Sequence, residues 1–175
     1  MPLNKLSLSR QEEIIDFINN LKLSIGMTYP ETPLKTIIST AIPGVLIKED
    51  NFGNNHHIKG AVFRESKDYK VPVIAIQSVQ SARSKTFALA HEFAHYMLNH
   101  NPKLNYLIDD RTFDGSATMQ NEGEANFFAQ SLLMPKALFE KLDKPFVDDR
   151  KLADYFGVTE SSVGVRREWL KRNGY

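Results

Sequence analysis

Cysteine is absent from the 175 residues of this chain. Without thiols, the protein cannot form a disulfide scaffold, a cysteine nucleophile, an iron–sulfur cluster or a cysteine-based zinc finger. Any transition metal that it binds must therefore be held by histidine nitrogens and carboxylate oxygens. The chain is also long enough to bury a sizeable hydrophobic core, so it needs no metal merely to fold.

Charge of one sign and long apolar runs are also scarce. Lys and Arg number 22 against 21 Asp and Glu, which gives a formal net charge of +1 and no sequence-wide reason to expect a nucleic-acid binder. No stretch approaches the roughly 18 uninterrupted apolar residues of a membrane span. The N-terminal segment leads into Gln11, Glu12 and Glu13 rather than into an apolar signal segment. We therefore expect a cytoplasmic protein with no membrane partner.

The order of the hydrophobic patterns predicts an α+β protein. Helical periodicity comes first, followed by short β-branched runs between turn residues, and then by helical periodicity almost to the end. The β-branched runs favour a small antiparallel sheet of two or three strands. The expected helices cover residues 9–24, 32–41, 84–99, 119–133, 137–142, 150–156 and 160–171, and the expected strands cover 45–47, 58–64 and 71–77.

The sequence HEFAH at residues 91–95 lies in the middle of a predicted helix. Residues four apart lie one turn above each other on a helix, so His91 and His95 can bind one ion while Glu92 reaches a water on that ion. Zinc suits two histidines with an open position for water, whose pKa it lowers so that Glu92 can act as general base. The competing interpretation is a helix with two half-buried histidines and a surface glutamate.

A catalytic zinc needs a third protein ligand, which we expect on the next long helix. Glu122 lies on the inward, apolar stripe of that helix, whereas Glu124 points elsewhere and is expected to be an ordinary first-turn acid. Asn126, one turn further on, could accept the second N–H of a zinc-bound histidine and fix its tautomer. If Glu122 is not the ligand, the alternatives are Glu124, Asp109, Asp110 and Asp114.

The other histidines are expected to lie away from the metal. His100 is placed off the ligand face, as an exposed cation at the helix end. His56 and His57 belong to an Asn-rich turn and are expected to be solvated. A donor that stabilises the oxyanion of a peptide-cleaving reaction cannot be chosen from the spacing alone. The candidates are Tyr96, Tyr106, Arg83 and His100.

Two blocks of sequence in combination resemble the ImmA/IrrE family of zinc metallopeptidases. They are TFALAHEFAH at residues 86–95, and EGEANFFA at 122–129 with LLMP at 132–135. The resemblance implies a zincin-like, gluzincin-type core in which the zinc-binding helix packs under a small sheet and a second helix supplies a glutamate. It implies His91, His95 and Glu122 as ligands of Zn²⁺, and Glu92 as the base.

One position departs from the family pattern. Many members carry a histidine four residues after the second ligand, where this chain has Asn99, and His100 follows one residue later. The departure concerns the role of that histidine and leaves the expected metal site unchanged.

The resemblance also implies a class of substrate. Family members of this size resemble anti-repressors of mobile elements that cleave a helix-turn-helix repressor, and others act in stress responses or beside toxin–antitoxin modules. We therefore expect an endopeptidase acting on a specific protein, such as a repressor or an antitoxin. The substrate would pair with an exposed strand along the cleft, expected at residues 71–77. The alternative is a non-catalytic regulator that uses the zinc site to bind a protein partner.

The C-terminal residues form a separate pattern. We expect a metallopeptidase domain at residues 1–142 and a helical, helix-turn-helix-like subdomain at 143–175. Residues 151–175 hold five Lys and Arg against three Asp and Glu, a surplus too small to favour DNA binding. The subdomain is therefore expected to pack against the core or to dock a protein. Its candidate DNA contacts are Arg166, Arg167, Lys171 and Arg172.

Overall fold

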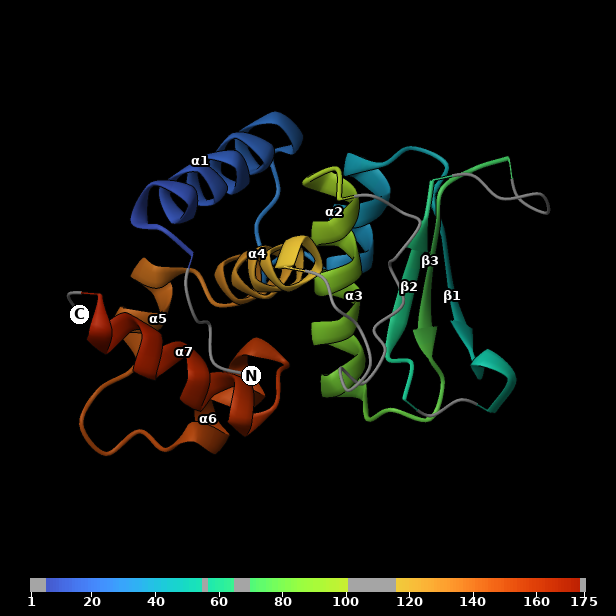
Figure 1. Cartoon of the computed structure of the whole chain (residues 1–175). Coiled ribbons are helices and arrows are strands. Elements are labelled where there is room, and N and C mark those ends of the chain that lie inside the picture. Colours follow the sequence, from blue (N-terminus) through green and yellow to red (C-terminus); the bar gives the residue numbers. More distant parts are fainter. Residues whose placement is uncertain (1–5, 55–56, 65–69, 101–115, 174–175) are drawn as a thin grey trace.

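The computed structural model describes residues 6–54, 57–64, 70–100 and 116–173 (Figure 1). Within these ranges the chain is α+β, as predicted, and no helix there is both long and apolar enough to cross a membrane. The strands are β1 (Leu46–Asp50), β2 (Gly60–Phe63) and β3 (Val73–Gln77), with a 3-10 turn η1 (Phe52–Asn54) after β1. The helices are α1 (Leu8–Ile25), α2 (Leu34–Ala41), α3 (Ala82–Met97), α4 (Ser116–Leu133), α5 (Lys136–Leu142), α6 (Asp149–Phe156) and α7 (Glu160–Arg172).

The sheet is mixed, so the prediction of purely antiparallel pairing is wrong. β3 lies between the other two strands and pairs in parallel with β1 and antiparallel with β2. All five residues of β3 are buried, as expected for the central strand of the sheet. The expectation of an exposed substrate-binding strand at residues 71–77 is therefore also wrong. Short apolar runs reveal that strands exist, but they do not fix the order or direction of those strands.

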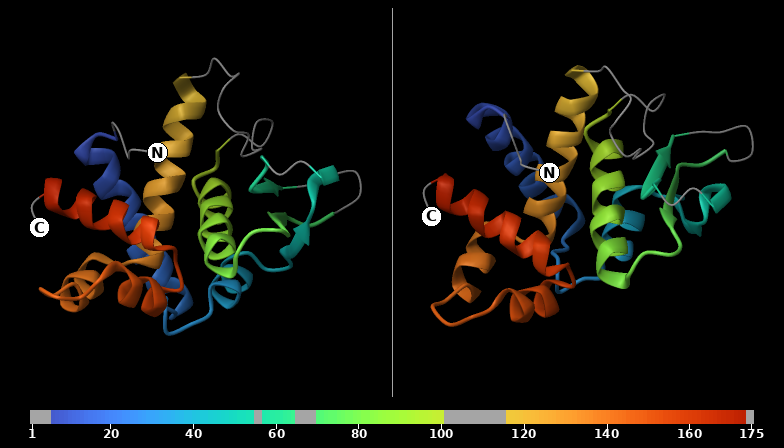
Figure 2. Two further views of the ribbon diagram at one scale, coloured as in Figure 1. Left: turned by 90° about the horizontal axis from the view of Figure 1, so that it is seen from below. Right: turned by 60° about the horizontal axis from the view of Figure 1, so that its bottom comes forward.

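Helix α3 lies between the sheet and helix α4. It packs against β2 and β3 on one side and against α4 on the other, and α1 in turn packs on α4 (Figures 1 and 2). Every side chain from Ala88 to His95 is buried. A helix that is covered all round belongs in the interior of a protein, and this position places residues 91–95 at the centre of the molecule.

Local signals set the ends of α3. Ser81 is the N-cap, and its side-chain oxygen accepts a hydrogen bond of 3.2 Å from the backbone N–H of Ser84. At the other end, Asn99 has a φ of 56°, in the left-handed region. The backbone N–H groups of Asn99 and His100 donate to the carbonyls of Tyr96 and His95. This pattern is a Schellman motif, which turns the chain back onto the helix that it has just left.

The C-terminal helices α6 and α7 contact each other and share buried side chains with the rest of the protein. Leu152, Phe156 and Val163 belong to the same hydrophobic cluster as the buried residues of α1 to α4. Arg166 of α7 is also buried, with 2% of its surface exposed, and donates a 3.0 Å hydrogen bond to the carbonyl of Met134. These contacts tie α7 to the end of α4. A division of the chain at residue 142 stays a prediction.

Candidate metal centre

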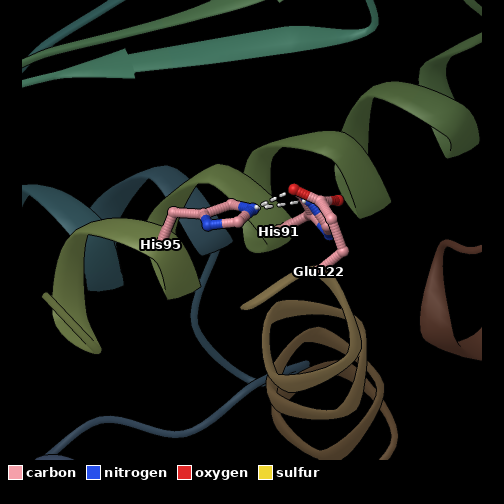
Figure 3. Close-up of side chains that lie close together, drawn as sticks. All are labelled: His91, His95 and Glu122. Atoms are coloured by element: carbon pink, nitrogen blue, oxygen red, sulfur yellow. Dashed lines mark hydrogen bonds and ion pairs between the residues drawn. The ribbon is translucent and has the colours of Figure 1, made fainter. Parts of the chain in front are cut away.

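Two histidines of α3 and one glutamate of α4 converge where these helices touch (Figure 3). The Nε2 atoms of His91 and His95 lie 3.0 Å apart. The carboxylate of Glu122 approaches both, with Oε2 at 3.2 Å from His91 Nε2 and Oε1 at 3.1 Å from His95 Nε2. One ligand atom from each side chain lies within 4.8 Å of the others. The three residues predicted as ligands therefore lie together, and they could hold a metal ion.

The helices position these groups by simple geometry. His91 and His95 are one turn apart on α3, so both project toward α4, and their exposed fractions are only 1% and 2%. Glu122 lies in the N-terminal half of α4, and 28% of its side chain is exposed. The histidines thus form the buried wall of the site, and Glu122 lies on the side open to solvent.

Each ligand histidine already has a partner for its second ring nitrogen. His91 Nδ1 lies 3.0 Å from Oδ1 of Asn126, so the contact predicted for Asn126 is present. His95 Nδ1 lies 2.9 Å from Nδ1 of His100. An amide oxygen can only accept, so His91 donates through Nδ1, and Nε2 is the nitrogen left to bind a metal. The Nε2 atoms of both rings face Glu122, as metal binding would require.

Burial and mutual contact shape the charges of the three side chains. Burial lowers the pKa of His95 to about 4, which keeps the imidazole neutral. Burial acts in the same direction on His91, but the contact with Glu122 outweighs it and raises the pKa of His91. Burial would raise the pKa of Glu122, but the two histidines outweigh it and hold that pKa well below the usual range. The carboxylate is therefore ionised, and the site favours a cation.

Glu92 lies beside the convergent ligands and is buried. It is 1% exposed, and neither carboxylate oxygen has a hydrogen-bond partner among the described residues. Burial, reinforced by the negative charge of Glu122, raises the pKa of Glu92 to about 8 in spite of the opposing effect of His91. Buried polar groups are almost always paired when their role is structural, so an unpaired buried carboxyl calls for another explanation.

Gly60, the first residue of β2, makes room for Glu92. A Cβ added at this glycine would lie 2.8 Å from Glu92 Cγ and 2.9 Å from Glu92 Oε1, closer than real Cβ atoms come to such neighbours. No motif or spacing in the sequence predicted a role for this residue. The available signal was a glycine at the start of a β-branched run, because glycine in a strand often marks the close approach of another group.

Two residues expected at the periphery are in fact buried, His100 next to His95 and Glu124 next to His100. His100 is 7% exposed and Glu124 is 3% exposed, and His100 Nε2 lies 3.3 Å from Glu124 Oε2. The expectations of an exposed helix-end cation and of an ordinary first-turn acid are therefore wrong. The physical reason is the Schellman turn at Asn99, which folds His100 back toward His95.

Glu124 is held as a carboxylate by its donors. Arg10 Nη2 donates to Oε2 at 2.6 Å, and Gln120 Nε2 donates to Oε1 at 3.0 Å. Burial would raise the pKa of Glu124, but the hydrogen bonds from Arg10, Gln120 and His100 outweigh it and lower that pKa. Burial also lowers the pKa of His100, which favours its neutral ring.

Of the other candidates that the structure describes, Arg83 and Tyr96 contact residues outside the ligand set. Arg83 forms an ion pair with Asp154 of α6, and the ring of Tyr96 lies 4.3 Å from the guanidinium carbon of Arg64. His57 is exposed in the turn before β2. Five other candidates lie outside the described residues, namely His56, Tyr106, Asp109, Asp110 and Asp114.

Comparisons with known proteins find a matching family model and a similar solved structure. The family model of the IrrE N-terminal-like domain, peptidase family M78, matches residues 43–168, a range that includes α3 and α4. Among solved structures, the chain is similar to a Mycobacterium tuberculosis transcriptional regulator, with 20% identity and a TM-score of 0.53 over 90% of this chain. It spans about half of that regulator, 51% of its length, and at this identity the likeness concerns the fold. No curated protein is detectably similar in sequence.

Proposed function

Because the chain belongs to the family of the IrrE N-terminal-like domain, we propose that it is a zinc-dependent endopeptidase. In this proposal His91, His95 and Glu122 hold the zinc, and Glu92 is the general base. One observation supports it most strongly. The carboxyl of Glu92 is buried without a hydrogen-bond partner among the described residues, directly beside a convergent set of two imidazoles and a carboxylate.

The donor set fits zinc. Zinc binds imidazole nitrogen and carboxylate oxygen, and its catalytic sites use three protein ligands so that a further position stays available. Both histidines present Nε2 to Glu122, while their Nδ1 atoms are occupied by Asn126 and His100. Zinc bound here would supply Lewis acidity that polarises a peptide carbonyl and acidifies water.

Glu92 moves the proton in the proposed reaction. Its carboxylate oxygens would take a proton from the attacking water and pass it to the amine that leaves. Burial makes this carboxylate a stronger base than an exposed glutamate, with a pKa raised to about 8. The positive charge of a zinc ion on the neighbouring ligands would favour the ionised form that a base requires. Gly60 leaves the space in which Glu92 adopts this position.

The strand best placed to bind substrate is β2. In the described part of the chain β2 pairs with β3 alone, so its other edge has no strand partner there. It begins at Gly60, next to Glu92. An extended peptide that paired with this edge would pass close to the proposed base, which is the geometry of strand addition. This assignment replaces residues 71–77, because β3 is enclosed between two strands.

The substrate class follows from family membership and from the charges of the C-terminal helices. We infer a cytoplasmic protein substrate, such as a helix-turn-helix repressor or an antitoxin. DNA is a poorer candidate because three of the four basic residues of α7 are buried or paired within the chain. Arg166 is buried, Arg167 pairs with Asp143 and Asp149, and Arg172 pairs with Glu168.

The product of the adjacent gene is the first protein to test as substrate. It should be cleaved by the wild-type chain on a gel and protected by a chelator. Glu92→Gln should bind zinc normally and slow cleavage by about 10²–10⁴-fold, the usual contribution of a general base. Glu12→Gln, on the exposed face of α1, is the matched control and should cleave normally. Unchanged cleavage by Glu92→Gln would refute the assignment of the base. Zinc-dependent association without cleavage by the wild type would instead favour the regulator alternative.

A further inference from the structure

A chain of buried and part-buried polar contacts runs from His95 to the N-terminal helix. His95 Nδ1 lies 2.9 Å from His100 Nδ1, and His100 Nε2 lies 3.3 Å from Glu124 Oε2. The same oxygen of Glu124 accepts a 2.6 Å hydrogen bond from Arg10 Nη2. The members come from α3, the turn after α3, α4 and α1. The chain of contacts therefore links α3 and α4 to α1, with Glu124 and Arg10 114 residues apart in the sequence.

The donors and acceptors fix the direction of this chain. The Glu124 carboxylate only accepts, so His100 must donate to it through Nε2–H. A neutral His100 then has a lone pair on Nδ1, and His95 must donate to that atom through its own Nδ1–H. The lone pair of His95 is left on Nε2, the atom that lies 3.1 Å from Glu122. The chain of contacts thus selects the tautomer of His95 that can bind a metal.

We propose that His100 and Glu124, anchored by Arg10, are positioning residues that fix the tautomer and ring orientation of His95 as a zinc ligand. The inference rests on the proposed zinc site. Outer partners of this kind orient a metal-bound histidine and raise its basicity. The two ligands are supported differently, because His91 contacts Asn126 of the neighbouring helix, whereas the support of His95 extends to Arg10. Arg10 also lies outside residues 43–168, the range that the family model matches.

The direct test is the zinc affinity of the full-length chain, measured by competition with a chromogenic chelator. His100→Ala and Glu124→Ala should each weaken zinc binding by about 10–100-fold, as is typical when such a partner is lost. Glu124→Gln keeps an oxygen that accepts from His100, so it should bind zinc more tightly than Glu124→Ala. Glu13→Ala is the matched control, because it removes the other, exposed partner of Arg10, and it should bind zinc as the wild type does.

A spectroscopic signature separates this role from a merely structural one. In ¹⁵N-histidine spectra of the zinc-loaded protein, His95 should carry its proton on Nδ1 and His100 on Nε2. Circular dichroism would verify folding, and if the alanine variants do not fold, His100→Gln and Glu124→Gln take their place with a smaller expected loss of affinity. Wild-type zinc affinity in folded variants, or a proton on Nδ1 of His100, would overturn the inference while leaving the zinc site intact. Failure of the wild type to bind zinc would refute the proposed function itself.

Discussion

The α3–α4 contact and the C-terminal helices each bury an ionisable side chain, but only the one in the C-terminal helices has hydrogen-bond partners among the described residues. Arg166 of α7 donates to the carbonyl of Met134 at 3.0 Å and to the hydroxyl of Ser131 at 3.4 Å, and its guanidinium lies 5.1 Å from the ring of Trp169. Glu92 of α3 is buried to the same extent and has no hydrogen-bond partner among the described residues.

This difference separates a structural site from a functional one. Burial disfavours the charged form in both cases, lowering the pKa of Arg166 to about 10 and raising that of Glu92 to about 8. The guanidinium stays charged near neutral pH and is stabilised by groups of the chain itself. The carboxyl of Glu92 gains no such stabilisation, so we attribute its burial to a ligand or a reaction. The α3–α4 contact should therefore respond to metal, and α7 should not.

Removing zinc should have the largest effect on stability. A ligand that binds only the folded chain adds about 4 kcal/mol to the free energy of unfolding when its free concentration is 1,000 times its dissociation constant. Denaturant unfolding with and without a chelator would measure this contribution. His95→Ala is the control, because it lacks a ligand and should unfold at the same midpoint in both conditions. Identical unfolding curves of the wild type with and without chelator would show that the α3–α4 contact does not respond to metal. It would then not differ from α7 in this respect.

Gly60→Ala should have the next largest effect, on cleavage rather than on zinc. The new Cβ would press on Glu92 at 2.8 Å, and a displacement of about 1 Å in a catalytic group can cost about 100-fold in rate. Cleavage assays paired with zinc titration would test it. The matched control is Gly164→Ala in α7, where the nearest atom outside the helix backbone is 3.5 Å away and alanine favours the helix. Normal cleavage by Gly60→Ala would mean that the rate does not depend on the space that Gly60 leaves for Glu92.

Arg166→Ala should destabilise the fold and leave the metal site unaffected. The substitution removes the buried guanidinium together with its hydrogen bonds. We expect the free energy of unfolding to fall by about 2–3 kcal/mol. Ser131, one of its partners, is roughly 14 Å along α4 from Glu122. Unfolding curves of the metal-free variant and its zinc affinity would be measured together. A parallel fall in zinc affinity would show that the two regions are coupled and would contradict the comparison.

The metal ligands could be predicted because their arrangement is nearly local. His91 and His95 are one helical turn apart, so a helix prediction already places them together. Glu122 could be predicted because it lies on the apolar, inward-facing side of the next helix. Asn126 lies on the same side one turn later, so its contact could be predicted in the same way. The distance between the two helices could not be obtained from the sequence, but the residue types and their faces could.

The support behind His95 could not be predicted in the same way. Arg10 and Glu124 are 114 residues apart, and no periodicity links them. His100 was placed on the helix surface by extending the 3.6-residue period past the point where α3 ends. Asn99 was the missed signal, because asparagine favours the left-handed conformation that ends a helix in a Schellman motif.

The order of the strands and the burial of Arg166 were missed for related reasons. The charged residues of β1, Lys48, Glu49 and Asp50, indicate an edge strand, but β2 and β3 are both apolar runs, so composition does not decide which of the two is central. Arg166 was counted as a surface cation on charge alone. Its burial depends on the carbonyl of Met134, at the end of a different helix, and a sequence pattern carries no information on such a contact.

The central claim is that His91, His95 and Glu122 bind zinc, and metal analysis of Glu122→Ala tests it most directly. After dialysis against metal-free buffer and titration with zinc, the wild type should bind one zinc ion per chain. The variant should lose affinity by more than the 10–100-fold typical of a supporting residue. Undiminished zinc binding by Glu122→Ala would contradict the account and would move the third ligand to another carboxylate.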